Sequence, residues 1–265
     1  SALACIAIQS NQNDQHGGQA IASFDYDMAP GVAKTYIKEY RRALGAALDL
    51  LLNHDAADDE AKAIIRQIRA ETGATPTLKP NKEFDDALRE RLTAMTDEAT
   101  VERMLHYATE RGYRETERRT YQAMEAFIHN LNTMHSRAGA QTPFSSINYG
   151  MDTSPEARMV MRNLLLATES GLGNGETPIF PIQIFRVKEG VSYNPGDPNY
   201  DLFRLAIRVS AKRLFPNFSF VDAPFNLQYY KPGHHETEIA YMGCRTRVIG
   251  NVYDPTREVC NRRGN

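Results

Sequence analysis

Cysteine is scarce in this sequence: there are three, Cys5, Cys244 and Cys260, and none lies in a C-x-x-C pair. Three cysteines cannot all form disulfides, and their spacings fit neither a zinc site nor an iron–sulfur cluster. The sequence therefore argues against a disulfide framework, predicts no metal site within the chain and favours a reducing, cytoplasmic compartment.

Long apolar runs are also missing. No run approaches the roughly 20 residues that a transmembrane helix needs, and no basic region precedes the N-terminal apolar patch, so we expect no signal peptide. The formal net charge is only −2, which gives no reason to expect binding to nucleic acid or to a membrane surface. The 265 residues, 42 % of them hydrophobic, are typical of a globular protein with one large domain or two ordinary ones.

The first half of the chain has mainly helical periodicity. Apolar residues from Tyr36 to Leu52 recur at three- and four-residue steps, which is typical of an amphipathic helix. Ahead of it we expect a short apolar helix and a short strand that ends at Pro30-Gly31. Further helices are predicted over 64–68, 87–95, 99–110 and 114–136. Their apolar faces predict packing on one another or across a dimer interface.

In the second half, strands and helices alternate. Ser154 is a good N-cap, Pro155 suits the first helical position and Gly171 follows the expected helix end. A second helix is predicted over 200–214. The strand candidates are TPFSSINYG, PIFPIQIFRV, FSFVDA, EIAYMG and TRVIGNVY. Such alternation predicts parallel strands with helical crossovers, hence an α/β sheet or barrel.

Other short motifs have ordinary structural interpretations. The glycine-rich GLGNGETP lacks the Gly-Lys-Ser/Thr of a phosphate loop, so we favour a helix end with a turn; SPEAR offers a helix N-terminus as an alternative anion site. His234-His235 beside Glu236 is interpreted as a solvated turn, because adjacent side chains rarely bind one metal ion. No Ser/His/Asp order and no paired-carboxylate motif stands out in the sequence, so nothing in it supports a hydrolase.

Cys244 lies between two short apolar runs, and its spacing alone favours a buried structural cysteine. The alternative is a thiol at the tip of a strand, exposed in a barrel interior. Gly243 would then allow close approach of a substrate. Arg245 and Arg247 would share one strand face and suit either an anion or ordinary ion pairs.

The wider sequence resembles the anaerobic (class III) ribonucleoside-triphosphate reductases, a glycyl-radical family. The motifs that carry the resemblance are QSNQNDQHGGQ, FDYDMAPGV, TPFSSINYG, GNGETPIFPIQIF, NPGDPNYDLF and IAYMGCRTRV followed by RGN. They extend over residues 1–265 in the family's order, least distinctly across 55–112. The chain is identified as the central segment of such an enzyme.

The resemblance implies an α/β fold that forms part of a ten-stranded α/β barrel with a helical dimer and effector region. Residues 1–35 would hold the first barrel helix and strand, and 36–137 the helical region. Residues 138–265 would hold barrel strands, crossover helices and the thiyl-radical loop. Helices 36–53 and 114–136 resemble the pair that forms the dimer interface and the effector site.

The activity implied by the resemblance is reduction of ribonucleoside triphosphates to deoxyribonucleoside triphosphates by a thiyl radical. That radical removes the 3′-hydrogen of the substrate, and the 2′-hydroxyl then leaves as water. Cys244 matches the family's thiyl cysteine, Met242 the methionine beside it and Asn265 the asparagine of the Arg-Gly-Asn motif. Members with this asparagine resemble the type that uses formate as reductant. Cys5 is interpreted as structural and Cys260 as incidental.

The resemblance also suggests residues that contact ligands. The candidates on the substrate side are Ser145, Ser146 and Asn148. The turn after that strand resembles the loop that reports which deoxynucleotide effector is bound, and its candidates are Tyr149, Gly150, Met151 and Asp152. These positions follow from the motif match and not from spacing.

Cofactors and partners are implied in the same way. The glycyl radical, on a glycine outside this chain, would be generated by an S-adenosylmethionine iron–sulfur activating protein, and a zinc site is expected outside the chain. Deoxynucleotide or ATP effectors and a second copy of the chain complete the expected partners. Because the family's second active-site cysteine and radical glycine are not in the sequence, we expect the 265 residues alone to be inactive. The alternatives are an inactive, deoxynucleotide-binding dimerisation module and another glycyl-radical enzyme.

Overall fold

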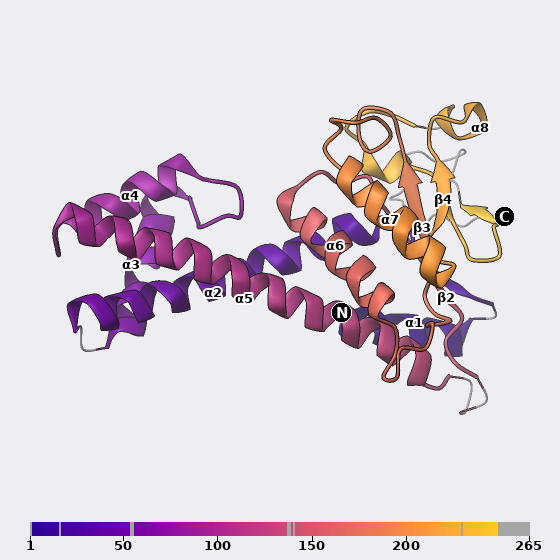
Figure 1. Cartoon of the computed structure of the whole chain (residues 1–265), viewed down its shortest axis with the longest axis horizontal. Coiled ribbons are helices and arrows are strands. Elements are labelled where there is room, and N and C mark those ends of the chain that lie inside the picture. The colour runs from indigo at the N-terminus through magenta and orange to yellow at the C-terminus, as the bar shows by residue number, and fades with distance from the viewer. Residues whose placement is uncertain are drawn as a thin grey trace. The chain divides into compact units, whose positions relative to one another are not determined.

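The computed structural model describes residues 2–248, except 16, 54, 55, 137, 138, 140 and 229. The chain forms two compact units: residues 30–120 make the first of them, and 1–29 together with 121–265 make the other. Two long helices, α2 (Phe24–Leu52) and α5 (Glu98–Thr133), contribute residues to both units (Figure 1).

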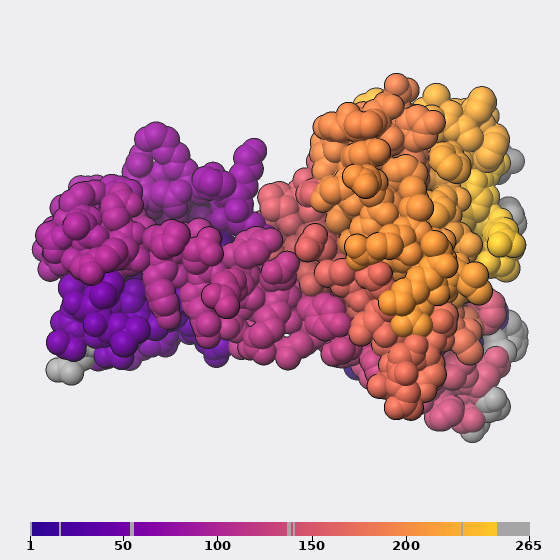
Figure 2. All heavy atoms as spheres, in the orientation of Figure 1, coloured from indigo at the N-terminus to yellow at the C-terminus, as the bar shows by residue number. Residues whose placement is uncertain are grey.

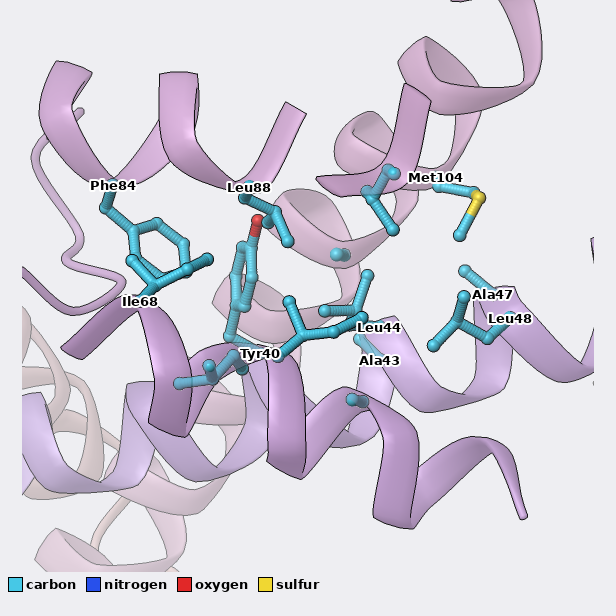
Figure 3. Close-up of a cluster of buried hydrophobic side chains, with 14 of the residues drawn as sticks. Tyr40, Ala43, Leu44, Ala47, Leu48, Ile68, Phe84, Leu88 and Met104 are labelled. Atoms are coloured by element: carbon cyan, nitrogen blue, oxygen red, sulfur yellow. The ribbon is translucent and has the colours of Figure 1, made fainter. Parts of the chain in front are cut away.

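The unit of residues 30–120 is helical and has its own core. Besides parts of α2 and α5 it contains α3 (Ala57–Thr72) and α4 (Lys82–Thr93), which confirms the predicted helices and extends the two short ones. Aromatic and aliphatic side chains from all four helices meet in one buried cluster, where the Tyr40 and Phe84 rings lie edge to face at 5.9 Å. Figure 3 shows part of this cluster, including Leu44, Leu48, Ile68, Leu88 and Met104.

The predicted boundary between helices 99–110 and 114–136 is wrong, because α5 runs unbroken through Gly112 and ends at Thr133. A β-carbon at Gly112 would lie 3.1 Å from the Cα atom and 3.2 Å from the backbone nitrogen of Tyr40. The glycine therefore serves a close approach of α5 to α2 and does not end a helix.

The strand predicted to end at Pro30-Gly31 is also shorter than expected. β1 is only Gln19–Ile21, and α2 begins at Phe24 with Pro30 inside it. Asp25 and Asp27 in the first turn favour a helix N-terminus at this place. The Phe24 ring is buried and lies 5.0 Å from the ring of Phe127, which fixes the start of the helix against α5.

The other unit is built on a four-stranded sheet in the order β1, β2 (Ser145–Tyr149), β3 (Ile182–Val187) and β4 (Asn217–Phe220), with every neighbouring pair parallel. Helix α6 (Pro155–Ser170) connects β2 to β3, and α7 (Tyr200–Arg213) connects β3 to β4. The Ser154 hydroxyl accepts a hydrogen bond from the Ala157 amide, as its N-cap position predicts. The predicted α/β class with helical crossovers is confirmed.

The two faces of this sheet have different coverings. Helices α6 and α7 pack on one face (Figure 1), where the Tyr149 hydroxyl donates to Gln183 and the Gln183 amide donates to Thr168 of α6, each at 2.8 Å. Atoms of α7 are part of the orange surface of this unit in Figure 2. Because successive strand residues point to opposite faces, the other face receives Asn148 of β2 and Arg186 of β3.

Short elements complete this unit. Helix α1 (Ala2–Asp14) precedes β1, and α8 (Pro224–Leu227) follows β4. After the 3-10 helix η1 (His235–Thr237), the antiparallel strands β5 (Ala240–Tyr241) and β6 (Arg247–Val248) form a hairpin. No helix among the described residues is both long and apolar enough to cross a membrane.

Leu44→Ala tests the core of the helical unit. Leu44 is fully buried, so its truncation is expected to lower the free energy of unfolding by about 2–5 kcal/mol, through lost burial and the cavity left behind. Urea titration followed by circular dichroism measures the effect. Leu50→Ala in the same helix is the matched control: Leu50 is 70 % exposed, and its replacement should change stability by no more than about 0.5 kcal/mol. Equal unfolding midpoints for the two variants would contradict this assignment of the core.

Candidate functional site

Cys244 lies at the tip of the β5–β6 hairpin, in a tight turn. The Arg245 amide donates to the Met242 carbonyl at 2.7 Å, and the Met242 amide donates to the Thr246 carbonyl at 2.9 Å. Arg245 has a φ of 69°, the left-handed conformation that closes such a turn. The Cys244 side chain is exposed. The structure thus excludes the buried structural cysteine that spacing alone favoured.

Thr246 sets the chemical environment of the thiol. The Cys244 Sγ atom lies 3.3 Å from the Thr246 hydroxyl oxygen. Hydrogen bonds from the Thr246 hydroxyl and from its backbone amide lower the pKa of the Cys244 thiol below its ordinary value. Cys5 is the opposite case: its side chain is 1 % exposed, and burial raises its pKa. Of these two thiols, Cys244 is the accessible and more acidic one.

A β-carbon at Gly243 would lie 2.4 Å from Ile182 Cδ1 and 3.1 Å from Ile182 Cβ, so the glycine lets the turn pack against β3, and it also lines a pocket beside the turn. One expectation about this turn is wrong. Arg245 and Arg247 do not share a strand face, because Arg245 belongs to the turn and only Arg247 is in β6. The Arg247 guanidinium donates to the Phe225 carbonyl of α8 at 2.7 Å.

Asn148 ties the hairpin to the sheet. Its side-chain oxygen accepts the Tyr241 amide at 2.8 Å, and its side-chain nitrogen donates to the Tyr241 carbonyl at 2.8 Å. The same nitrogen lies 3.4 Å from the Ile21 carbonyl of β1. The Asn148 side-chain amide therefore bonds to both backbone polar groups of Tyr241, as the backbone of a neighbouring strand would. Both polar atoms of this candidate substrate residue are engaged with backbone, and these bonds hold β5 beside β2.

A pocket of about 450 Å³ lies beside the turn. Polar side chains of β4 and α8 contribute to its wall, together with the hairpin itself. The lining includes Asn217, Ser219, Asn226, Tyr241, Met242 and Arg245. Tyr241 is fixed there by its hydroxyl, which donates to Asn226 Oδ1 at 3.0 Å. The rest of the lining is mostly apolar, including Ile184, Phe218 and Phe225, so the hairpin presents Met242 to a mainly apolar cavity, with the thiol two residues further along the turn.

The other substrate candidates are separated by the sheet. Ser146 has the strand parity of Asn148 and lies on the face of the hairpin, whereas Ser145 has the parity of Tyr149 and lies on the face covered by α6. Both serines are buried, and the Ser145 hydroxyl has no hydrogen-bond partner within the described part of the chain.

The effector candidates form a turn that is bonded from two sides. Asp25 Oδ2 accepts the backbone amides of residues 150, 151 and 152 at 2.9, 2.9 and 3.1 Å. The Asn199 side chain donates to the carbonyls of Gly150 and Asp152, both at 3.1 Å. Tyr149 and Met151 are buried, and Asp152 is partly exposed.

A buried charge cluster lies next to this turn, and the sequence patterns did not predict it. Arg186 is 0 % exposed; its Nη2 lies 3.4 Å from Asp25 Oδ1 and its Nη1 lies 2.8 Å from Glu238 Oε2. The Tyr26 hydroxyl donates to Glu238 Oε1 at 2.9 Å. Burial raises the pKa of Glu238, and Arg186 partly opposes that effect. The available signal was an arginine in the strand candidate IQIFRV, whose other residues apart from Gln183 are apolar, because a charge in such a strand requires a partner.

The remaining candidates do not form a metal site. His234 Nδ1 lies 2.7 Å from Glu236 Oε1 in an exposed turn, as the sequence predicted. Across the described residues no group of three or more His, Cys, Asp or Glu side chains is placed to hold a metal ion. Asn265 and Cys260 lie outside the described residues.

Of the two cysteines that the structure describes, Cys244 is the accessible one; it lies on a glycine-containing turn, and the resemblance predicts this residue as the radical cysteine. A sequence model of the family described as anaerobic ribonucleoside-triphosphate reductase matches residues 1–265. The chain belongs to this reductase family. The family indicated by the sequence motifs is therefore confirmed.

Individual members of the reductase family match parts of the chain. The anaerobic ribonucleoside-triphosphate reductase of Haemophilus influenzae is 33 % identical over 150 residues, which are 56 % of this chain and 20 % of that protein. The enzyme of the same name from Escherichia coli is 34 % identical over 127 residues, 48 % of this chain and 17 % of that protein. The one from enterobacteria phage T4 is 33 % identical over 195 residues, 70 % and 31 % respectively. The matched region thus spans less than a third of each relative.

Thr246→Val tests the environment of the Cys244 thiol. Without the hydroxyl the thiolate loses its principal stabilising contact, so the pKa of Cys244 should rise and its alkylation by iodoacetamide should require higher pH. The pH profile of the rate is measured by mass spectrometry of the peptide that contains Cys244. Thr246→Ser keeps the hydroxyl and should keep the profile. A profile that does not move in Thr246→Val would show that the hydroxyl has no part in the acidity.

Asn148→Leu tests the tether of the hairpin. The change keeps a similar volume but removes both bonds to Tyr241, each worth about 1 kcal/mol. Amide hydrogen exchange of residues 239–248 should therefore accelerate about ten-fold or more. Ser146→Ala, on the same strand face, provides the control and should leave exchange in the hairpin unchanged. Unchanged exchange in both variants would refute the tether.

Proposed function

We propose that this chain carries the radical thiol of an anaerobic ribonucleoside-triphosphate reductase, and that Cys244 is that thiol. The observation that carries the proposal is the position of Cys244: it is exposed at the tip of a hairpin that is bonded to the sheet of a chain belonging to this family. Cys5, by contrast, is buried in α1.

In the proposed reaction the Cys244 sulfur receives the 3′-hydrogen of a ribonucleoside triphosphate as a hydrogen atom. The S–H bond forms as the 3′ C–H bond breaks, and the unpaired electron moves to the sugar. For this the sulfur must first be a thiyl radical, which the glycyl radical, on a glycine elsewhere in the enzyme, would form by taking the hydrogen atom of the Cys244 S–H bond. The 2′-hydroxyl then takes up a proton and leaves as water, and formate, the proposed reductant, supplies two electrons and its hydrogen as it is oxidised to carbon dioxide. The Cys244 S–H finally returns its hydrogen atom to C3′, which restores the thiyl radical.

The described residues act in this scheme by placing the sulfur. Hydrogen-atom transfer depends steeply on the distance between sulfur and carbon, and less on the acidity of the thiol. The turn bonds at Met242 and Arg245, the packing of Gly243 on Ile182 and the tether from Asn148 all restrict where the Cys244 sulfur lies. Met242 lines the adjacent pocket, so it would contact a ligand bound there.

The wider assembly is part of the same proposal. The four parallel strands would contribute to a ten-stranded barrel that encloses the thiol and excludes water, which protects a radical from side reactions. Residues 1–35 and 138–265 would belong to that barrel, and residues 36–137 to a dimer and effector region that binds deoxynucleotides or ATP. In the turn of Tyr149–Asp152, the partly exposed Asp152 is best placed to meet an effector.

Partners follow from the radical chemistry. A cytoplasmic activating protein with S-adenosylmethionine and an iron–sulfur cluster would generate the glycyl radical, and a zinc site would lie outside this chain. Formate as reductant rests on Asn265 of the Arg-Gly-Asn sequence motif.

Cys244→Ser in the complete reductase that contains this chain tests the proposal. The variant should form the glycyl radical, quantified by electron paramagnetic resonance, yet produce no deoxynucleotide, because the hydroxyl O–H bond is too strong for the radical to be passed on. Cys5→Ala is the control, since it alters a buried thiol and should retain turnover. Normal product formation by Cys244→Ser would refute the assignment.

A further inference from the structure

The strand β3 carries a fully buried arginine whose charge is compensated by two segments far away in sequence. Arg186 contacts Asp25 at 3.4 Å through Nη2 and Glu238 at 2.8 Å through Nη1, and no exposed surface remains on its side chain. Its Nε and Nη1 atoms have no hydrogen-bond partner in the part of the chain that the structure describes, so the Nη1 contact with Glu238 is an ion pair without hydrogen-bond geometry. The two carboxylates therefore determine where the guanidinium lies.

On one side this cluster holds the turn that follows β2. Asp25 Oδ1 faces Arg186, while Asp25 Oδ2 accepts the amides of residues 150–152. Gly150 has a φ of 125°, and a β-carbon there would lie 2.5 Å from the Arg186 carbonyl oxygen. The turn is thus in contact with Arg186 through Asp25 and also directly through the backbone.

On the other side the cluster holds the segment that enters the thiol hairpin. Glu238 is 3 % exposed and directly precedes Ile239 and Ala240, which are 2 % and 1 % exposed. Glu238 is bonded by Tyr26 at Oε1 and faces Arg186 at Oε2. Any displacement of the Arg186 guanidinium therefore acts on the start of β5.

We propose that Arg186 is a positioning residue that couples the 150–152 turn to the hairpin carrying Cys244, through Asp25 on one side and Glu238 on the other. The coupling rests on the proposed function, because it matters for turnover only if Cys244 is the reacting thiol. An apolar residue would fill the same place in β3 without the cost of burying charges. The arginine instead fixes one relative geometry of turn and hairpin.

Three substitutions in the complete reductase test the coupling by weakening it to different extents. Tyr26→Phe removes one bond to Glu238, Glu238→Gln keeps that acceptor but removes the charge facing Arg186, and Arg186→Lys keeps the charge but cannot reach two carboxylates with a planar fork. Arg213→Lys is the matched control. Arg213 also makes several bonds in this unit, to the carbonyls of residues 169, 170 and 175, but these cap α6.

Turnover per glycyl radical and KM for the ribonucleotide are measured for each variant. We expect Glu238→Gln and Arg186→Lys to lower kcat per radical by about ten-fold or more with KM changed less than about two-fold, since a misplacement near 1 Å can cost about 100-fold in rate. Tyr26→Phe should have a smaller effect. Arg213→Lys should retain kcat per radical, even if it lowers the melting temperature.

Amide hydrogen exchange gives a second readout that does not depend on turnover. Glu238→Gln should accelerate exchange in residues 239–248 and, through Arg186 and Asp25, also at residues 150–152, whereas Arg213→Lys should leave both segments protected. Acceleration confined to the hairpin would overturn the coupling. An active Cys244→Ser enzyme would instead refute the proposed function, and the exchange result would still decide whether the two segments are linked.

Discussion

The burial of one positive charge, on Arg186, constrains much of the unit formed by residues 1–29 and 121–265. A fully buried arginine loses its hydration and is tolerated only where carboxylates replace the lost water, and breaking such a pair costs about 3–5 kcal/mol. Arg186 meets this requirement with Asp25 and Glu238. These come from the start of α2 and from the segment before β5, so compensating the charge also fixes where both segments lie on the sheet.

Once these segments are fixed, the thiol turn has little freedom. Asn148 bonds to both backbone polar groups of Tyr241, and Gly243 packs on Ile182 without room for a β-carbon. The sulfur of Cys244 is left exposed with Thr246 beside it. Such an arrangement suits chemistry that depends on the position of one atom, as the proposed hydrogen-atom transfer does.

Local sequence signals predicted an element correctly wherever its structure depends on residues close together in the chain. The spacing of apolar residues in α2, and the Ser154, Pro155 and Gly171 signals of α6, predicted these helices because they depend on neighbours along the chain. The breaks predicted at Pro30 and Gly112 are wrong because a helix continues through each of these residues, and contacts with other elements decide this. At Gly112 the close approach of Tyr40 gives the glycine its purpose.

The sequence alone therefore determined the α/β class, most helices, the parallel strands and the family, since each is written in periodicity or in contiguous motifs. The motif match also predicts Cys244 as the thiyl cysteine, which stays a prediction. Only the tertiary structure decided that Asn148 bonds to backbone, that Ser145 rather than Ser146 lies on the face covered by α6, and that Asp25, Arg186 and Glu238 meet. These facts depend on strand register and on contacts between residues more than 50 positions apart, for example Asp25 with Arg186, and no local pattern records such contacts.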